Sequence, residues 1–462
     1  MSKISKTKIS AGIFWLEVPE AELFVLCGCP ADSIKHLMKA GKIHDYETEN
    51  NSDSGPKHHS HGKITNETGP NAILLSDLSV QKGDFANLAE FPVLQMLYRQ
   101  GMLIPNHPNN TGAKPLLIGH EKVVNAQMNY IYRGNYGLTS LEELLATGLS
   151  QEQAEEMMRI KLYFAFGEIR PSSDLLNSVI VDHKPVKVLN GVTVVRKGIN
   201  CYEFFYKDES AEIDLNLAKN ETYETPYKLE YHYFKRDYFS IVHTGEGDGW
   251  DIDRPCMASV ICFQGKIFLI DVGPNIAHTL NAIGVDVNEV EGIFHTHAHD
   301  DHFAGLTTLI HTNHKIKYYS TKMVRDSVTK KLSSLMSIEE HVFAQYFEVC
   351  DLEFDKWNNI NGLEVKPVYS PHPVETNILF FRTLWENGYA TYAHLADVTS
   401  QDVLNKMLQE NKKKPGISRK LKKKVWNDYL RTAQVKKIDI GGGIIHGKAE
   451  DFKDDKSKKI IL

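Results

Sequence analysis

The segment THAHDDH, residues 296–302, places three histidines and two aspartates within seven residues. The apolar segment VEGIF (290–294) precedes it and FAGLTTLI (303–310) follows it. The polar group therefore lies at the end of a predicted buried strand. Unpaired polar side chains are costly to bury in such a place, and coordination of a metal ion removes that cost. We predict a metal site in this loop.

The spacing of the ligand-type residues favours two ions. His297 and His299 are two residues apart in an extended stretch, so they project to the same side and can bind one ion. Asp301 and His302 can turn onto a second ion beside it. One short loop would thus supply half of a dinuclear site.

The segments around the motif predict a β-meander that leads into an α/β unit. Alternating and apolar runs predict strands over 239–245, 257–263 and 266–273, and a helix over 276–284. The apolar strand 290–294 then delivers the histidines at its C-terminal end. Ligands and catalytic groups collect at such strand ends in layered α/β proteins.

The motif resembles the H-x-H-x-D-H signature of the metallo-β-lactamase superfamily, and the resemblance covers about residues 238–450. It implies a fold in which two sheets are packed between helices, an αββα sandwich. It also implies a further histidine, a bridging acidic residue and a last histidine, in that order and near strand ends. His372, Asp397 and His446 fit these three positions.

Two of these residues have alternative interpretations. His372 could be a turn residue between two prolines, although prolines on both sides also fix the backbone around a ligand. Asp397 could cap a helix, and His394 could compete with it as a ligand. We assign catalytic roles to His394 and to Asp301, the latter being also a ligand.

Asp271 ends the predicted strand KIFLID and stands where the superfamily has a buried aspartate that orients the motif histidines. A carboxylate that accepts the second N–H of a ligating imidazole fixes the tautomer of that imidazole. The alternative is an aspartate that starts a turn before Gly273-Pro274.

Two divalent ions can acidify a bridging water and hold the oxygens of an ester or phosphodiester, so the predicted reaction is hydrolysis. Histidine at position 299, where the diiron branch of the superfamily carries glutamate, favours zinc, with manganese and iron as alternatives. The segment 243–274 looks most like the branch of tRNase Z and the cyclic-nucleotide phosphodiesterases, so a phosphodiesterase acting on a nucleotide or cyclic nucleotide is the leading hypothesis. A lactonase or thioesterase and a diiron oxygen-binding sensor are the alternatives.

With 462 residues the chain is long enough for two domains, which we place at 1–230 and 231–462, with a polar linker over 208–228. Four segments of the first half echo segments of the second in the same order: 24–41 echoes 267–284, 73–88 echoes the region ending at 306, 115–126 echoes 316–327, and 190–206 echoes 361–382. Two unrelated α/β segments with similar patterning are the alternative. A true duplication would give a degenerate N-terminal copy, because the positions of the motif ligands hold Ser79, Gln81, Gly83 and Asp84.

The charge and hydrophobicity of the chain limit the classes of ligand that we expect it to bind. The formal net charge of −6 argues against a general binder of nucleic acids or anionic membranes, and the hydrophobic runs are too short for a membrane helix. The segment 411–426 is locally basic and could attract phosphates, or could be a solvated helix face. We expect a cytoplasmic protein with reduced cysteines that acts on a small phosphodiester or ester. RNA is the less favoured ligand, and a homodimer is compatible with these expectations.

Two further features are local. The polar segment 50–68 contains His58, His59 and His61, which we interpret as part of a surface insertion and not as a metal site. Gly441, Gly442 and Gly443 allow the backbone to approach closely just before His446.

Overall fold

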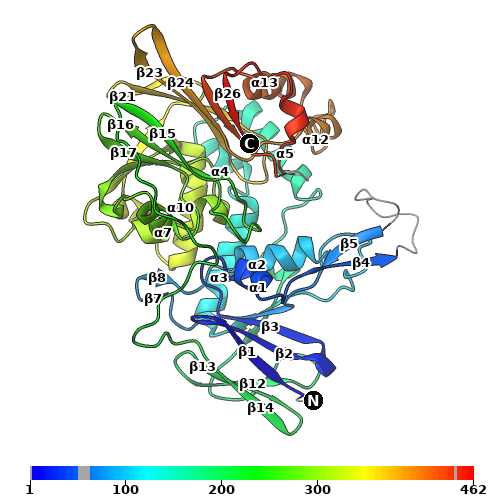
Figure 1. Ribbon diagram of the computed structural model, residues 1–462. Coiled ribbons are helices and arrows are strands. Elements are labelled where there is room, and N and C mark those ends of the chain that lie inside the picture. Colours follow the sequence, from blue (N-terminus) through cyan, green and yellow to red (C-terminus); the bar gives the residue numbers. More distant parts are fainter. Residues whose placement is uncertain (1–2, 50–62, 442–444) are drawn as a thin grey trace. The chain divides into compact units, whose positions relative to one another are not determined.

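The computed structural model describes residues 3–49, 63–441 and 445–462. His58, His59, His61, Gly442 and Gly443 lie outside the described residues. The chain divides into two compact units. Unit 1 comprises residues 1–131, 170–228 and 249–253, and unit 2 comprises 132–169, 229–248 and 254–462. Figure 1 shows the elements coloured along the chain.

Unit 2 contains two six-stranded sheets. The strands of the first, in spatial order, are β15 (Phe239–Gly245), β16 (Ala258–Phe263), β17 (Lys266–Ile270), β18 (Val290–Phe294), β19 (Ile316–Thr321) and β20 (Phe347–Leu352). Its first two pairings are antiparallel and the next three are parallel. The meander and the apolar strand predicted from the sequence are confirmed.

The strands of the second sheet are β21 (Asn358–Ile360), β22 (Leu363–Tyr369), β23 (Asn377–Trp385), β24 (Gly388–Leu395), β25 (Val435–Ile438) and β26 (Lys459–Ile461). Here the first three pairings are antiparallel and the last two are parallel. Apolar side chains of both sheets, such as Phe268, Phe294, Leu379 and Phe381, form one buried cluster between them. The two sheets are therefore packed face to face.

Helices cover the outer faces of this sandwich. The helices of unit 2 are α4 (Leu141–Ala146), α5 (Gln151–Phe164), α7 (Ile276–Ala282), α8 (Asp300–Phe303), α9 (Leu306–Leu309), α10 (Lys322–Met336), α11 (Phe343–Tyr346), α12 (Gln401–Lys406) and α13 (Arg419–Tyr429), with short 3-10 turns at Val287–Glu289, Glu340–Val342 and Ala449–Phe452. Helix α10 packs on β19 and β20. Apolar side chains of α4, α5, α12 and α13 cluster with the outward residues Val368, Ile378 and Phe380 of the second sheet. Unit 2 is thus the αββα sandwich that the motif predicted (Figure 1).

Unit 1 has a first sheet with the same order and directions of strands. Its strands are β1 (Ser5–Ser10), β2 (Ile13–Val18), β3 (Leu23–Cys27), β6 (Ala72–Leu74), β9 (Leu116–Gly119) and β10 (Asn177–Ile180). Two antiparallel pairings are followed by three parallel ones, as in unit 2. The second sheet has four antiparallel strands, β11 (Val186–Lys187), β12 (Thr193–Gly198), β13 (Cys201–Tyr206) and β14 (Glu209–Asp214).

The remaining elements of unit 1 are the hairpins β4 (Asp45–Glu49) with β5 (Lys63–Glu67) and β7 (Val80–Gln81) with β8 (Asp84–Phe85), the helices α1 (Ser33–Lys39), α2 (Glu90–Leu94) and α6 (Ser172–Leu175), a 3-10 turn at Pro19–Ala21 and a π-helical turn at Gln95–Arg99. Helix α3 (Glu121–Tyr136) follows β9 as α10 follows β19. Each of the four segment pairs noted in the sequence contains corresponding elements, for example β3 and α1 against β17 and α7. The repeated strand order supports the duplication.

The structure differs from the sequence expectation in two places. Residues 209–214 form β14 and not a linker, because this strand pairs with β13 while its alternate side chains face solvent, which gives it a polar composition. Residues 132–169 lie in the first half of the sequence but belong to unit 2. A single boundary at residue 230 therefore does not separate the compact units.

Within the described parts of the chain, no helix has both the length and the apolar character that crossing a membrane requires.

Candidate metal centre

The structure brings the seven candidate ligands together at one end of the unit 2 sandwich. Each follows the C-terminal end of a strand: the motif residues follow β18, His372 follows β22, Asp397 follows β24 and His446 follows β25. The ligand-type atoms of His297, His299, His372 and Asp397 all lie within 4.8 Å of one another, as do those of His297, Asp301 and His302. Strand ends of both sheets thus converge on one place, as parallel strand ends do in layered α/β folds.

The first group surrounds a small space lined by nitrogen and oxygen atoms. His297 Nε2 and His372 Nε2 each lie 3.3 Å from Asp397 Oδ2, and His372 Nε2 lies 3.0 Å from His299 Nδ1. The Nε2 atom of His297 is buried and makes no hydrogen bond. Ligand atoms about 2.0 Å from a tetrahedral zinc ion lie about 3.3 Å from one another. The group therefore fits a metal ion.

Asp397 faces a second group through its other oxygen. Asp397 Oδ1 lies 3.1 Å from His302 Nε2, and Asp301 Oδ2 lies 3.7 Å from the same nitrogen. Asp397 also lies within 4.8 Å of the ligand-type atoms of Asp439 and His446. A carboxylate with its two oxygens turned to two groups of ligands can bridge two ions.

Asp271 fixes the orientation of two motif histidines. Its Oδ2 accepts hydrogen bonds from His302 Nδ1 at 2.8 Å and from Thr296 Oγ1 at 2.7 Å. Because the Thr296 hydroxyl donates to Asp271, it accepts from His297 Nδ1, which lies 3.0 Å away. Both imidazoles then carry their proton on Nδ1 and turn the Nε2 lone pair to the site. The interpretation of Asp271 as a carboxylate that orients the histidines fits this geometry.

The backbone at Asp271 is left-handed, with a φ of 60°. A non-glycine residue pays about 1 kcal/mol or more in this region. The bend immediately after β17 aims the carboxylate at the motif, where it bonds Thr296 and His302. Gly273 follows, and a Cβ there would lie 2.4 Å from the Asp301 carbonyl oxygen, so only glycine lets the motif come this close.

Burial and neighbouring charges shift the pKa values of these residues strongly. Burial lowers the pKa of His297 to about 3 and raises that of Asp301 to about 7. Burial also acts to lower the pKa of His302, but the carboxylates of Asp301, Asp397 and Asp271 outweigh it and hold that pKa well above its usual range. The site thus concentrates negative charge around His302, which a divalent cation would also neutralise.

Asp439, directly after β25, is a site residue that the sequence interpretation missed. Its Oδ2 accepts from His446 Nδ1 at 2.7 Å, which leaves His446 Nε2 as the free ring nitrogen. Burial acts to lower the pKa of His446, but Asp439 and Asp397 raise it to about 10. The position of Asp439 at a strand end, seven residues before His446, was the signal that could have identified it.

Lys331 of α10 is a second missed residue. Its fully buried ammonium donates to the Ala298 carbonyl oxygen at 2.6 Å and pairs with Asp300 Oδ1 at 2.8 Å. These two positions alternate with the ligands of the motif. No sequence signal marks a lysine in an amphipathic helix as a partner of a loop 31 residues earlier.

His394 lies within the sandwich and belongs to none of the ligand groups found among the described residues. It is fully buried, and its Nδ1 lies 3.0 Å from the Tyr392 hydroxyl. Burial, with the nearby charge of Lys437, lowers its pKa to about 3, so the ring is neutral. Its catalytic role stays a prediction.

The loop of unit 1 that corresponds to the motif has a different residue at the position of His297. Gly28 N donates to Leu74 O as Asp271 N donates to Phe294 O, so counting from the strand ends aligns Asp77, and not Ser79, with His297. The β7–β8 hairpin lengthens this loop by two residues, because Phe85 lies 11 residues after Leu74 and Phe303 lies 9 residues after Phe294, so the pairing of Ser79 with His297 expected from the sequence is wrong.

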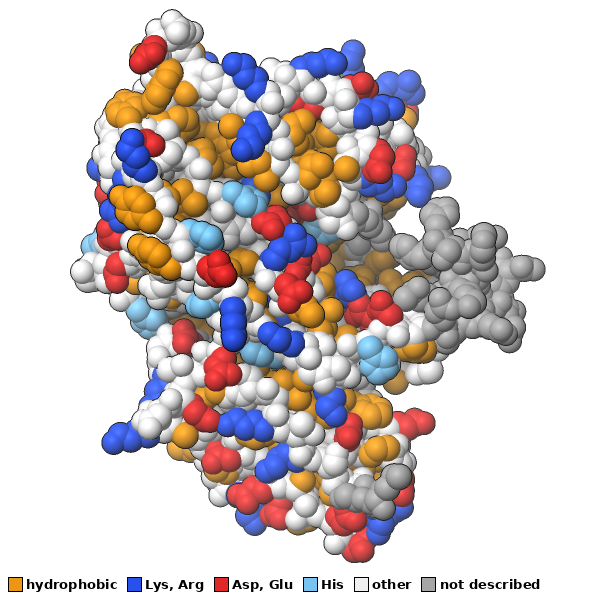
Figure 2. Space-filling model, viewed as in Figure 1, with side chains coloured by type: hydrophobic (Ala, Val, Ile, Leu, Met, Phe, Trp, Pro, Cys, Tyr) orange, Lys and Arg blue, Asp and Glu red, His pale blue; other side chains and the backbone are white. Residues whose placement is uncertain are grey.

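The basic segment 411–426 is partly neutralised in the structure. Lys412 pairs with Glu152 at 3.4 Å, Arg419 with Glu410 at 3.1 Å, and Lys424 with Asp428 at 2.8 Å. On the face shown in Figure 2, Lys and Arg side chains are interspersed with acidic ones and form no continuous basic surface. These contacts favour a solvated face over a phosphate-binding patch.

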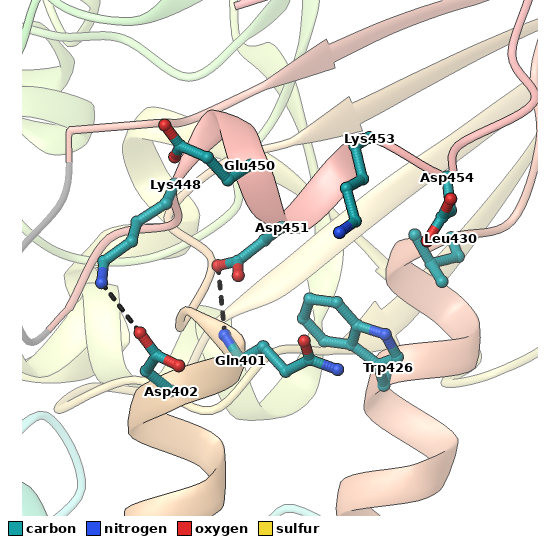
Figure 3. A pocket seen from close by; sticks show the side chains of 9 residues that line it. All are labelled: Gln401, Asp402, Trp426, Leu430, Lys448, Glu450, Asp451, Lys453 and Asp454. Carbon is teal, nitrogen blue, oxygen red and sulfur yellow. Dashed lines mark hydrogen bonds and ion pairs between the residues drawn. The ribbon is translucent and has the colours of Figure 1, made fainter.

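A pocket of about 590 Å³ lies beside α12 and α13. Figure 3 shows the Trp426 indole on one side of it, the ion pair of Lys448 with Asp402, and Asp451 accepting from Gln401 N. Four carboxylates and two lysines line this pocket, so its charge does not suit a phosphate group. None of the candidate ligands lines it.

Comparisons with known proteins agree with the motif. A family model described as "Anti-Pycsar protein Apyc1" matches residues 239–411. The chain is 26% identical over 147 residues to "cAMP/cGMP-dependent 3',5'-cAMP/cGMP phosphodiesterase B" of Dictyostelium discoideum, and 37% identical over 60 residues to a Ribonuclease Z of Clostridium kluyveri. These matches cover 31% and 13% of this chain, and 13% and 20% of the lengths of the two relatives.

Among solved structures, a diphosphatase of the PhnP family and the short form of human tRNase Z are similar to this chain. Each is 15% identical and matches 48% of the chain, covering 83% and 95% of its own length, with TM-scores of 0.34 and 0.33. The fold assignment rests on the strand order and layers of unit 2.

Proposed function

We propose that this member of the metallo-β-lactamase superfamily is a metal-dependent phosphodiesterase that acts on a nucleotide or cyclic nucleotide. The observation that carries the proposal is the placement of Asp397, with Oδ2 at 3.3 Å from His297 and Oδ1 at 3.1 Å from His302. This arrangement suits a carboxylate that bridges two divalent ions, and paired ions are suited to phosphodiester displacement.

The residues that would hold the ions divide into two sets around Asp397. His297, His299 and His372 would hold the first ion, and Asp301, His302 and His446 the second. The mixed nitrogen and oxygen donors favour zinc, with manganese and iron as alternatives.

Bound ions would supply Lewis acidity and a hydroxide at neutral pH. The chain's own residues would prepare the site for them. Asp271 and Thr296 hold the imidazoles of His302 and His297 in one tautomer, and Asp439 does the same for His446. Burial of the motif residues keeps competing water away from the ligand atoms.

The choice of substrate is supported by the names of the relatives, two of which denote phosphodiester-cleaving enzymes. The ion pairs that Lys412 and Arg419 form with Glu152 and Glu410 reduce the positive charge of the segment 411–426, which favours a small nucleotide over RNA.

The test is an activity panel on the full chain, loaded with zinc, manganese or iron. It contains 3′,5′-cyclic nucleotides, bis(p-nitrophenyl) phosphate, a structured RNA, a lactone and a thioester. We expect the fastest turnover on a cyclic nucleotide and close to two bound ions per chain. The variant Asp397→Asn should lose both the turnover and the bound metal. Faster turnover of the lactone or thioester would favour the other hydrolase class, and reversible oxygen binding by an iron form would favour the sensor. A chain that binds no metal would refute the proposal.

A further inference from the structure

The loop that carries His372 is tied down on both sides of the histidine. On one side the Pro371 carbonyl oxygen accepts a hydrogen bond from Thr399 Oγ1 at 2.5 Å. On the other side the Pro373 carbonyl oxygen accepts from Lys161 Nζ at 3.1 Å. Thr399 lies two residues after Asp397, but Lys161 comes from α5, 212 residues before Pro373.

Lys161 and Glu375 form a buried ion pair beside this loop. Lys161 Nζ lies 2.8 Å from Glu375 Oε1, and the two side chains are 4% and 3% exposed. The ammonium also donates to the Tyr136 carbonyl oxygen. Its three protons therefore have three acceptors, two of which belong to the loop of His372.

The other oxygen of Glu375 sits in a backbone socket. Glu375 Oε2 accepts from Leu138 N at 2.9 Å. A Cβ on Gly137 would lie 2.1 Å from the same oxygen, so the glycine leaves the space that the carboxylate fills. The turn after α3 and the helix α5 thus hold one end of the loop, and both belong to unit 2.

Burying an ion pair is expensive, and a well-packed apolar pair is often as stable. Here the ammonium holds both the Pro373 carbonyl oxygen and the Glu375 carboxylate of the loop. His372 has proline on each side, so the backbone that carries its ring has little freedom once the carbonyls of both prolines are held. The ring then stays with Nε2 at 3.0 Å from His299 Nδ1 and 3.3 Å from Asp397.

We propose that Lys161 and Glu375 are positioning residues that fix His372 for the first metal ion. The segment 132–169 thereby helps to hold a ligand of the metal centre, although in the sequence it lies between β9 and β10 of unit 1. This inference rests on the proposed two-ion site.

The experiment is a calorimetric titration of the metal-free full chain with Zn²⁺, repeated with Co²⁺ for its visible spectrum. The main variant is Lys161→Met with Glu375→Gln, which removes the pair without leaving a buried charge. We expect wild type to bind two ions and the variant to lose about 10- to 100-fold in affinity for one of them, with the other unchanged. Adding His446→Ala to the variant should then weaken the remaining ion.

A matched control is Lys436→Met with Asp455→Asn, which removes another buried pair of unit 2, one whose ammonium donates to the Tyr429 carbonyl oxygen and not to the loop of His372. We expect it to bind both ions as wild type does. If the main variant does not fold, Glu375→Gln alone should show a smaller loss confined to one ion.

The outcomes separate the two proposals. Wild type without metal would refute the two-ion site itself. Two results would overturn the role of Lys161 and Glu375 if wild type binds two ions and the variant folds. In the first, the variant binds both ions with the affinities of wild type; in the second, it loses affinity equally for both ions. A loss of affinity that is confined to the ion whose binding His446→Ala leaves unchanged supports the positioning role of Lys161 and Glu375.

Discussion

Where unit 2 places Asp271, unit 1 has Gly28, and the two residues share a left-handed backbone, with φ of 60° and 78°. Both follow the third strand of their sheet. In unit 1 the least strained residue occupies this bend, whereas unit 2 accepts the strain to place a carboxylate against His302 and Thr296. The left-handed bend is therefore a feature of the shared strand arrangement, whereas the carboxylate serves the candidate site of unit 2.

A second difference lies three residues after the ends of β6 and β18, where unit 1 has Asp77 at the place of His297. Asp77 Oδ2 pairs with Arg196 at 2.8 Å, and Oδ1 accepts from the Tyr202 hydroxyl at 2.8 Å. Unit 1 thus neutralises its buried carboxylate with an arginine. Unit 2 gathers histidines and aspartates in a pattern that suits a metal cation.

The largest effect is expected from the motif. Asp301→Ala and His302→Ala should each reduce hydrolysis by at least about 100-fold, on the order of 3 kcal/mol in barrier, because each removes a candidate ligand. Steady-state rates on the best substrate measure this. Ser79→Ala, in the corresponding loop of unit 1, is the matched control and should leave the rate unchanged. Full activity of Asp301→Ala with an unchanged melting temperature would contradict the two-ion assignment.

Copying the unit 1 residue into unit 2 should have the next largest effect. Asp271→Gly relieves the strained backbone but removes the carboxylate that orients His302, so metal affinity should fall about 10- to 100-fold. Titration of the metal-free protein with Zn²⁺ measures it. Asp271→Asn tolerates the same φ and keeps one oxygen, so it should lose less. Equal affinities in wild type and Asp271→Gly would mean that the contact is only structural.

Breaking the ion pair of unit 1 should affect stability and not metal binding. Arg196→Met leaves Asp77 largely buried without its cation, which should lower the free energy of unfolding by about 2–3 kcal/mol. Urea denaturation measures the change. The companion Arg196→Met with Asp77→Asn should recover part of it, and metal content should stay at the wild-type value in both. A loss of metal would mean that the roles assigned to the two units are too simple.

The smallest expected effect is a change in the pH dependence of stability, caused by Glu143 in the segment 132–169 of unit 2. Burial acts to raise the pKa of Glu143, but hydrogen bonds from Arg133 and Thr139 and the charge of Lys330 lower it to about 2. Because the folded value lies below the ordinary 4.5, the stabilisation is complete above about pH 4.5 and is lost as the pH falls through 2. Glu143→Gln should therefore melt lower than wild type at pH 7, with a difference that shrinks toward pH 3. A difference independent of pH would exclude this carboxylate as its source.

Much of the fold could be predicted from local patterns. The strands β15 to β18 and helix α7 follow from alternating and apolar runs whose meaning depends on near neighbours. Strand β14 could not be predicted in this way, because an edge strand with one face in solvent has the composition of a loop. The assignment of residues 132–169 to unit 2 could not be predicted from the sequence either, because the pattern of a helix shows which of its faces is apolar but not which sheet that face packs on.

The candidate ligands could be identified from the sequence, because H-x-H-x-D-H and the strand ends that precede His372, Asp397 and His446 are local features. The residues that hold those ligands in place could be identified only in the folded chain. Lys331 meets Asp300 across 31 residues, and Lys161 meets Pro373 across 212. The reason is physical: a ligand is marked by its own chemistry and its place on a strand, whereas a buried lysine takes its meaning from the carbonyl and carboxylate oxygens that folding brings to it.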